Sequence, residues 1–350
     1  MVQYRLATNA DNQQLIQLTS ASGMAGEIAL RIDRKPDFFK LLNMRGESKV
    51  FVAVDENIIV GSICVSREDV YVDGQIYPLQ YFADFKISEP YRNKTIGYRL
   101  CRELENYVFE IGADLAFINY AKGNTKPTRF FFNRQNTPDF ENIGIFNIHQ
   151  FIGKKKKAFH PKYKIEPGQV SDELIKFLNA HYSKFELGTV VTNEKLEGSI
   201  IFTIQENDKI IAALCLLDTM GVKQNVVTGV SWKMKYLLKI LTMLNRLFGL
   251  SKMPKINEAV SMIYIKYLAV NNNEKQLVRL LIDHARNIAY EKSYSFVSVG
   301  VHEKDPINTC LSGLFKMTFS SVGMVLSLKN NKELIEKVKR GIPFADYSVV

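Results

Sequence analysis

A short stretch of polar and basic residues joins a strand-like segment to a helix-like segment in the first half of the chain. This stretch is SEPYRNKTIGYRL, from Ser88 to Leu100. Arg92 and Lys94 stand beside the predicted helix start, and Gly97 falls in its first turn. The N–H groups and the dipole of a helix start favour an anion, and a glycine lets it approach the backbone. The turn therefore predicts a pyrophosphate site, although an ordinary strand-to-helix loop with surface basic residues has the same pattern.

The segments around this turn predict a sheet that contains a parallel pair of strands. LQYFADFKI (79–87) has the composition of a strand, and DLAFINYA (114–121) predicts another strand after the helix. Apolar residues at three- and four-residue spacing mark the helix between them. Two strands joined through a helix are expected to be parallel, with a right-handed crossover. Ligands of such sheets bind at the carboxyl ends of the strands, where the turn lies.

A similar order of segments occurs twice in the chain. Residues 47–74 and 197–221 each have two apolar strands around a polar turn, which predicts a β-hairpin in both places. A strand, a helix and a second strand follow each hairpin, so each half is expected to be a mixed α/β sheet. The pattern breaks at 153–167, which includes the lysine run GKKKK. The predicted domains are therefore residues 1–155 and 156–350.

The order of elements and the sequence ISEPYRNKTIGYRL resemble the GNAT superfamily of acyl-CoA-dependent N-acyltransferases. In outline, the turn of that family is Val-x-Pro-x-x-Arg-x-x-Gly-x-Gly, with Arg or Gln opening the last part. Ile87, Arg92 and Gly97 match the apolar residue, the Arg or Gln position and the last glycine. Thr95 replaces the first glycine, and Pro90 stands one place late. The resemblance implies two tandem GNAT-like acyl-CoA N-acyltransferase domains, of which the C-terminal copy is degenerate.

The resemblance also implies where acetyl-CoA, or another acyl-CoA, would bind as substrate. Backbone amides from Asn93 to Tyr98 would hold the pyrophosphate, and the pantetheine arm would pair with the backbone of Phe85 to Ile87. A second signature of the family would place Asn124 and Phe131 beside the coenzyme. The implied cofactor-binding residues are Phe85, Lys86, Ile87, Arg92, Asn93, Lys94, Thr95, Ile96, Gly97, Tyr98, Asn124 and Phe131.

Phe131 stands where the family often keeps a tyrosine that protonates the leaving thiolate. A phenylalanine has no proton to give. Tyr120 or another nearby tyrosine would then substitute, or water would protonate the thiolate. The following segment FENIGIFNIHQF (140–151) is expected to supply the last hairpin of the first domain.

The resemblance implies a catalytic base on the cleft face of the strand before the turn. Counting back by twos from Ile87 places Phe85, Ala83 and Tyr81 on that face. Tyr81 has the only polar side chain there, so Tyr81 and Tyr120 are the predicted catalytic residues. Tyr81 could equally be a core aromatic residue, and deprotonation through water is the default. Asp84 points to the other face unless a bulge intervenes.

Residues 23–42 lie where GNAT proteins cover the cleft of the amine acceptor. Glu27, Arg31, Asp33 and Arg34 could meet a polar acceptor, but a solvated helix face is the favoured interpretation. In the second half, NNNEKQLVRL (271–280) has no glycine, and its glutamate would repel phosphate. We therefore expect the second half not to bind CoA.

Residues 231–255 combine apolar residues at helical spacing with charged residues that are all basic. This composition suits an interfacial helix on an anionic membrane or a lid over a lipid-like substrate. An amphipathic helix that packs on the core or on a partner subunit is the alternative.

Composition limits the remaining function classes. The chain has 350 residues and a net charge of +10, which suits nucleic acid, an anionic membrane or an anionic cofactor. None of its four cysteines has metal-ligand spacing, so buried free thiols and no metal site are expected. The sequence shows no signal-peptide pattern and no uncharged apolar run of about 20 residues. A cytoplasmic location follows as an expectation.

The leading hypothesis is an N-acyltransferase that acts on the primary amine of a small molecule or amino sugar. The alternatives are a non-catalytic CoA-binding or scaffold protein and a tRNA-dependent aminoacyl transferase of the cell-wall type. Arg92 and Gly97 argue against the tRNA-dependent enzyme, so nucleic acid is not an expected partner.

Overall fold

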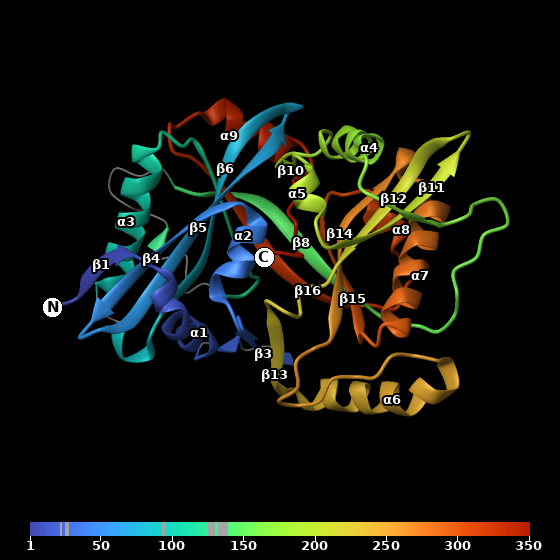
Figure 1. The fold of residues 1–350 in the computed structure, drawn as a ribbon, viewed down its shortest axis with the longest axis horizontal. Helices are drawn as coiled ribbons and strands as arrows, with labels where there is room; N and C mark the ends of the chain where they lie inside the picture. Colours follow the sequence, from blue (N-terminus) through green and yellow to red (C-terminus); the bar gives the residue numbers. More distant parts are fainter. Residues whose placement is uncertain (22, 25–27, 93–94, 125–129, 132–138) are drawn as a thin grey trace.

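The computed structural model describes residues 1–21, 23–24, 28–92, 95–124, 130–131 and 139–350, except for the side chains of 237, 241 and 244–247. A mixed sheet runs through the whole molecule, and helices cover both of its faces (Figure 1). In spatial order its strands are β1 (Gln3–Leu6), β4 (Glu47–Asp55), β5 (Ile58–Val72), β6 (Gln75–Ile87), β7 (Leu115–Ala121), β16 (Met317–Ser327), β8 (Glu141–Ile152), β15 (Phe296–His302), β14 (Met262–Val270), β12 (Lys209–Leu217), β11 (Ser199–Glu206) and β9 (Glu166–Gly168).

The remaining elements connect or cover this sheet. The short strand β10 (Gly188–Thr189) pairs with β5, and a separate small sheet has the order β13 (Gln224–Val230), β3 (Ile28–Asp33) and β2 (Gly23–Met24). The α-helices are α1 (Asn12–Ser20), α2 (Phe38–Arg45), α3 (Ile96–Glu110), α4 (Asp172–Tyr182), α5 (Asn193–Leu196), α6 (Trp232–Phe248), α7 (Lys275–Glu291), α8 (Ile307–Cys310) and α9 (Lys332–Arg340).

The two predicted hairpins are present, and their turns have the same backbone conformation. Glu56 and Asn57 link β4 to β5 with φ angles of 47° and 67°. Asn207 and Asp208 link β11 to β12 with φ angles of 52° and 59°. Two consecutive positive φ angles are typical of the type I′ turn, whose twist suits a two-residue hairpin. The mixed α/β fold class is therefore confirmed.

Each half also has the predicted parallel pair of strands connected through a helix. β6 pairs with β7 in parallel, and α3 connects them. β14 pairs with β15 in parallel, and α7 connects them. Leu100, Leu104 and Val108 of α3 repeat every four residues and are buried against the sheet. Burial of each such side chain contributes about 1.5–3 kcal/mol.

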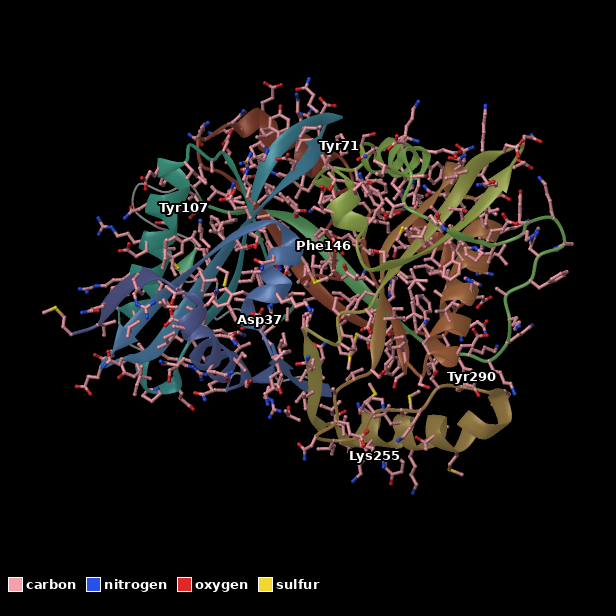
Figure 2. All side chains as sticks on the ribbon, viewed as in Figure 1. Asp37, Tyr71, Tyr107, Phe146, Lys255 and Tyr290 are labelled. Atoms are coloured by element: carbon pink, nitrogen blue, oxygen red, sulfur yellow. The ribbon has the colours of Figure 1, made fainter. Side chains whose placement is uncertain are left out.

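The two halves exchange their last strands. β8 belongs to the first half in sequence but pairs with β15 of the second half, and β16 of the second half pairs with β7 of the first. β8 and β16 also pair with each other, antiparallel, in the middle of the sheet. Figure 2 places Phe146 of β8 in the middle of the molecule, where the halves meet. The division into domains 1–155 and 156–350 stays a prediction.

The hairpin expected in residues 140–151 is therefore wrong. Residues 141–151 belong to one strand of twelve residues, β8. Both of its partners come from the second half, and the local sequence contains no information about so distant a partner.

The expectation about the cysteines is confirmed. All four cysteines are free and buried: Cys64, Cys101, Cys215 and Cys310. No helix within the described part of the chain has the length and apolar character that crossing a bilayer requires.

The exchanged strands predict that the two halves unfold together. Gly323 of β16 faces β8, and a Cβ atom there would lie 2.5 Å from the Phe146 ring. We expect Gly323→Val to cost about 1–3 kcal/mol of the free energy of unfolding, because the core would be overpacked. Hydrogen exchange at increasing urea, followed separately in β5 and β12, should show one shared midpoint that moves down for both strands.

The matched control is Gly221→Ala, because no atom lies within 4 Å of a Cβ at that position. Its free energy of unfolding should stay within about 0.5 kcal/mol of the parent value. Separate midpoints for β5 and β12 in the parent protein would contradict a shared unfolding unit.

Candidate functional site

The parallel strands of the N-terminal half separate toward their carboxyl ends. Their pairing ends at Tyr81 and Phe117. Beyond this point β6 keeps β5 on one side and β7 keeps β16 on its far side. Within the described chain, no strand pairs with the other edge of residues 82–87. The backbone N–H and C=O groups of that edge can therefore pair with an extended ligand.

A β-bulge at Asp84 changes which side chains share a face of β6. Asp84 has a φ of 50°, and the register with β5 slips by one residue at this point. Tyr81 and Ala83 pack in the cluster on the side of α9, whereas Phe85 and Ile87 pack on the side of α3. The count that placed Phe85 and Tyr81 on one face is therefore wrong, because a bulge inverts the alternation.

Because of the bulge, the Asp84 carboxylate lies in a buried cluster of charges. Nη2 of Arg34 lies 2.8 Å from both carboxylate oxygens, and Nη1 of Arg45 lies 3.3 Å from one of them. Burial alone would raise the pKa of the Asp84 carboxyl, but the two arginines outweigh it and hold that pKa well below its usual range. Asp84 is therefore an ionised partner of the arginines and a poor base.

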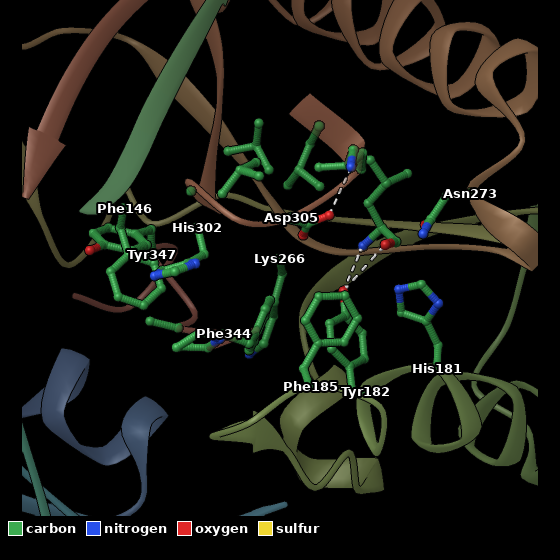
Figure 3. A pocket seen from close by; sticks show the side chains of 18 residues that line it. Phe146, His181, Tyr182, Phe185, Lys266, Asn273, His302, Asp305, Phe344 and Tyr347 are labelled. Atoms are coloured by element: carbon green, nitrogen blue, oxygen red, sulfur yellow. Dashed lines mark hydrogen bonds between the residues drawn. The ribbon is translucent and has the colours of Figure 1, made fainter. Parts of the chain in front are cut away.

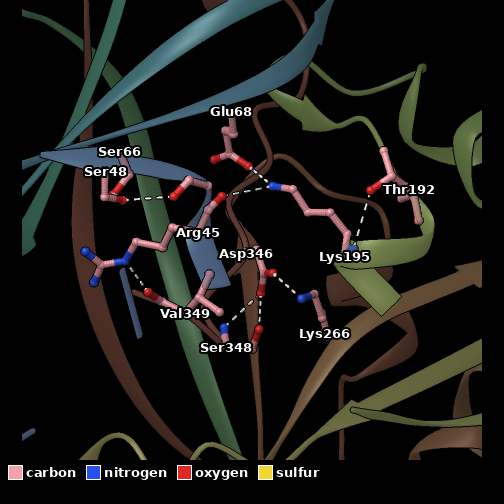
Figure 4. A network of polar contacts seen from close by, with 12 residues as sticks. Arg45, Ser48, Ser66, Glu68, Thr192, Lys195, Lys266, Asp346, Ser348 and Val349 are labelled. Atoms are coloured by element: carbon pink, nitrogen blue, oxygen red, sulfur yellow. Dashed lines mark hydrogen bonds and ion pairs between the residues drawn. The ribbon is translucent and has the colours of Figure 1, made fainter. Parts of the chain in front are cut away.

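The cluster reaches the C-terminal segment of the chain. Arg45 donates from Nε to the main-chain oxygen of Val349, and Lys223 donates to the main-chain oxygen of Val350. Figure 4 shows the Arg45 contact beside a second bridge, in which Lys195 binds Glu68 at 2.7 Å. Lys195 and Lys223 come from the second half, so these contacts join the two halves at the site.

Residues 23–42 differ from the favoured expectation of a solvated helix face. Arg31 and Asp33 lie in strand β3 and pair with each other at 2.9 Å. Arg34 is 1% exposed, and its Nε and Nη1 atoms have no hydrogen-bond partner within the described structure. Glu27 lies outside the described residues. Neither the burial of Arg34 nor its pairing with Asp84 could be inferred from a sequence separation of fifty residues.

The two predicted catalytic tyrosines lie on opposite faces of the sheet. Tyr81 is buried, and the guanidinium of Arg45 lies 5.2 Å from the centre of its ring. Burial raises the pKa of Tyr81 to about 12, so this phenol keeps its proton at neutral pH and can donate a hydrogen bond. Tyr120 is half-buried and packs in the cluster on the side of α3. The structure therefore does not bring the two hydroxyls together.

The turn that is predicted to bind an anion leads directly into helix α3. Thr95 is the exposed N-cap of the helix, and Ile96 and Gly97 are buried in its first turn. Arg92 is partly exposed, lies 3.9 Å from Glu89 and donates from Nε to the carbonyl oxygen of Ile87 at 3.4 Å. The predicted ligands Asn93 and Lys94 lie outside the described residues, whereas Tyr98 is exposed.

Aromatic rings pack beside this helix start. A Cβ atom at Gly97 would lie 2.5 Å from the ring of Phe130, so the glycine is needed for this packing. Phe131 is buried, with its ring 5.9 Å from that of Phe85 and 5.8 Å from that of Phe140. The remaining predicted ligands differ in exposure: Lys86 is half-buried, Ile87 is buried and Asn124 is exposed.

The corresponding opening in the second half contains the C-terminal segment of the same chain. The parallel pairing of β14 and β15 ends at Tyr264 and Ser298. The pocket beyond that point is lined by Phe344 and Tyr347, together with Tyr182 of α4 (Figure 3). A Cβ atom on Gly300 of β15 would lie 2.1 Å from the Tyr347 ring, so this strand accepts the segment only with a glycine there.

Comparison with known proteins agrees with this geometry. Residues 14–135, which include β6, α3 and β7, match the model described as the acetyltransferase (GNAT) family. The chain has the GNAT fold. None of the curated protein sequences compared with the chain matches it. The match covers the segment that contains the turn and supports its resemblance to that family over residues 14–135.

Solved structures with the GNAT fold match nearly the whole chain. A GCN5-related N-acetyltransferase from Anabaena variabilis ATCC 29413 has a TM-score of 0.54 and 11% identity, over 93% of this chain and 72% of that chain. One from Kribbella flavida has a TM-score of 0.53 and 10% identity, over 93% and 70%. Saccharomyces cerevisiae N-myristoyltransferase with bound myristoyl-CoA has a TM-score of 0.62 and 11% identity, over 93% and 78%.

The buried charges of this GNAT fold predict an acid-sensitive stability. Asp84→Asn leaves Arg34 and Arg45 without their anionic partner, which should cost about 3–5 kcal/mol of the free energy of unfolding at pH 7. Because the folded pKa of Asp84 is lowered, its stabilisation is present above the unfolded pKa of about 3.9 and is lost as the pH falls toward the folded pKa. Urea unfolding at several pH values measures both effects.

The control is Asp69→Asn, because Asp69 is an exposed carboxylate on the neighbouring strand β5. This variant should keep the stability and the acid dependence of the parent protein. The account of the cluster fails if Asp84→Asn is as stable as the parent at pH 7.

Proposed function

We propose that the protein is an acyl-CoA-dependent N-acyltransferase that acts on the primary amine of a small molecule or amino sugar. The edge of residues 82–87 with which no described strand pairs carries this proposal, because it opens beside the start of α3 in a region that matches the GNAT family model. Acetyl-CoA is the first candidate donor. Longer acyl-CoA is the second, since one structure with the same fold contains myristoyl-CoA.

The pantetheine arm would pair with the backbone of Phe85 to Ile87 as an added half-strand. Its pyrophosphate would lie at the start of α3, where the first amide groups of a helix have no partner within the helix. Arg92 would add a positive charge beside it. The C-terminal segment lines the equivalent opening of the second half, which supports placing the acyl-CoA in the first half.

Acyl transfer forms a C–N bond and breaks the C–S bond of the thioester. The amine nitrogen attacks the carbonyl carbon, loses a proton to water, and the CoA thiolate leaves and takes up a proton. We assign the donor of that last proton to Tyr120, because it packs in the same cluster as Phe131, where the family keeps its tyrosine. Tyr81, on the other face beside Arg45, would donate a hydrogen bond to the acceptor.

The test of the function uses a charge at the N-cap of α3. Thr95→Glu should raise the KM for acyl-CoA at least about tenfold, because a carboxylate would repel the pyrophosphate. The melting temperature should not fall, since an acidic residue stabilises a helix start by about 0.3–1 kcal/mol. The assay measures thiol release from acetyl-CoA and from longer acyl-CoA esters in the presence of a panel of amines.

Thr95→Gln is the matched control, because it has nearly the same size without the charge, and it should keep a KM close to that of the parent. The proposed site is wrong if Thr95→Glu and Thr95→Gln bind acyl-CoA equally well. An absence of both acyl-CoA binding and thiol release in the parent protein would refute the function itself.

Substitution of Tyr120 and substitution of Tyr81 should change the kinetic constants in different ways. Tyr120→Phe removes the proposed proton donor and should lower kcat about 100-fold with little change in the KM for the amine. Tyr81→Phe removes a hydrogen bond to the acceptor and should mainly raise that KM. Steady-state kinetics with both substrates varied would distinguish the roles, and the reverse pattern would exchange the two assignments.

A non-catalytic CoA-binding protein is the second candidate function. The observation that favours it is Phe131, which is buried and which, by the resemblance, stands where the family often keeps a tyrosine, although a phenylalanine has no proton to give. Stabilisation of the parent protein by acyl-CoA, without thiol release for any amine, would establish this function in place of the enzyme.

A further inference from the structure

Helix α6 lies at the edge of the molecule, between β13 and β14 in sequence and away from the main sheet (Figure 1). Met234 and Leu238 on its inner face pack against a cluster of buried side chains that includes Val260 and Met262. These contacts fix the orientation of α6 relative to the rest of the protein. The opposite face is therefore turned outward.

The outward face of α6 carries a row of large apolar side chains. Trp232 is 70% exposed, Tyr236 66%, Ile240 51% and Met243 71%. Their spacing of four, four and three residues places them along one side of the helix. Soluble proteins rarely expose so many adjacent apolar side chains without a binding partner.

The charges beside this row all have the same sign. Lys233, Lys235 and Lys239 are exposed on α6, and residues 231–255 contain no aspartate or glutamate. Long lysine side chains can keep their stems along an apolar surface while the charged ends reach an anionic one. An anionic layer above an apolar layer is the environment at the surface of a membrane that contains acidic lipids.

We propose that α6 binds the surface of an anionic lipid bilayer and lies in the plane of its headgroups. Trp232, Tyr236, Ile240 and Met243 enter the boundary with the acyl chains, and the lysines contact lipid phosphates. A protein partner would explain the apolar row but not the excess of lysines, and RNA would explain the lysines but not the apolar row. The proposal does not depend on the acyl-transfer function.

The sequence provides its own reporter, because Trp232 is the single tryptophan of the chain. Addition of vesicles of phosphatidylcholine and phosphatidylglycerol to the full chain should shift the tryptophan emission to shorter wavelength and sediment the protein. Vesicles of phosphatidylcholine alone should give much weaker binding. High salt should weaken the binding to the mixed vesicles, because it screens the charges of the lysines.

Two pairs of substitutions separate the apolar and the ionic contributions while Trp232 stays in place. Tyr236→Ser with Met243→Ser should abolish the emission shift. Lys235→Gln with Lys239→Gln should weaken partitioning about 25-fold, which corresponds to about fivefold per lysine. Ile58→Ser is the control, because Ile58 is 62% exposed on a distant hairpin, and its binding should not change.

Circular dichroism of each variant in the absence of vesicles checks that it is folded. Equal behaviour with neutral and anionic vesicles, or no emission shift with either, overturns the proposal. A second outcome would also overturn it: the parent protein forms a concentration-dependent dimer, the variant with Tyr236→Ser and Met243→Ser does not, and neither protein binds vesicles. The apolar row would then be a contact between two copies of the chain. Retention of RNA without an emission shift in vesicles would likewise overturn it.

Discussion

The antiparallel pairing of β8 with β16 determines how the rest of this molecule is arranged. Each of these strands belongs to one half by sequence and to the other by its outer neighbour. Neither half can complete its sheet without the other, because the missing strand would expose a row of unpaired backbone groups. The two halves of the chain therefore form one sheet rather than two connected bodies.

The same pairing leads the C-terminal segment back into the middle of the molecule. After β16 and α9, Tyr347 bonds to Ser321 of β16 and packs on Phe146 of β8. The chain then reaches Arg45 of α2 through the oxygen of Val349. One end of this segment thus lines the opening of the second half, while its other end borders the charged cluster of the first half. The two halves have a similar order of segments in sequence, but the C-terminal segment makes their structures different.

Local sequence was sufficient for the parts of the fold that depend on neighbouring residues. The hairpins at Glu56 and Asn207, the parallel pairs and the start of α3 follow from turn composition and apolar spacing. The exchanged strands, the bulge at Asp84 and the pair of Asp84 with Arg34 depend on contacts between residues far apart in the chain. A single bulge places Tyr81 and Phe85 on opposite faces of β6. One extra residue inverts the alternation of side chains for every residue that follows it in the strand.

The charged cluster and helix α6 belong to one continuous set of contacts. α6 directly follows β13, and β13 pairs with β3 from Val230–Ile28 to Gln224–Asp33. The residue after the end of β3 is Arg34, whose guanidinium binds the carboxylate at the bulge of β6. A path of strand pairing and one ion pair thus runs from α6 to β6, whose edge at residues 82–87 we assign to the acyl donor. These contacts fix the position and orientation of the helix relative to the site. A bilayer bound by α6 would therefore hold the acceptor side of the sheet in a defined orientation to the lipid surface.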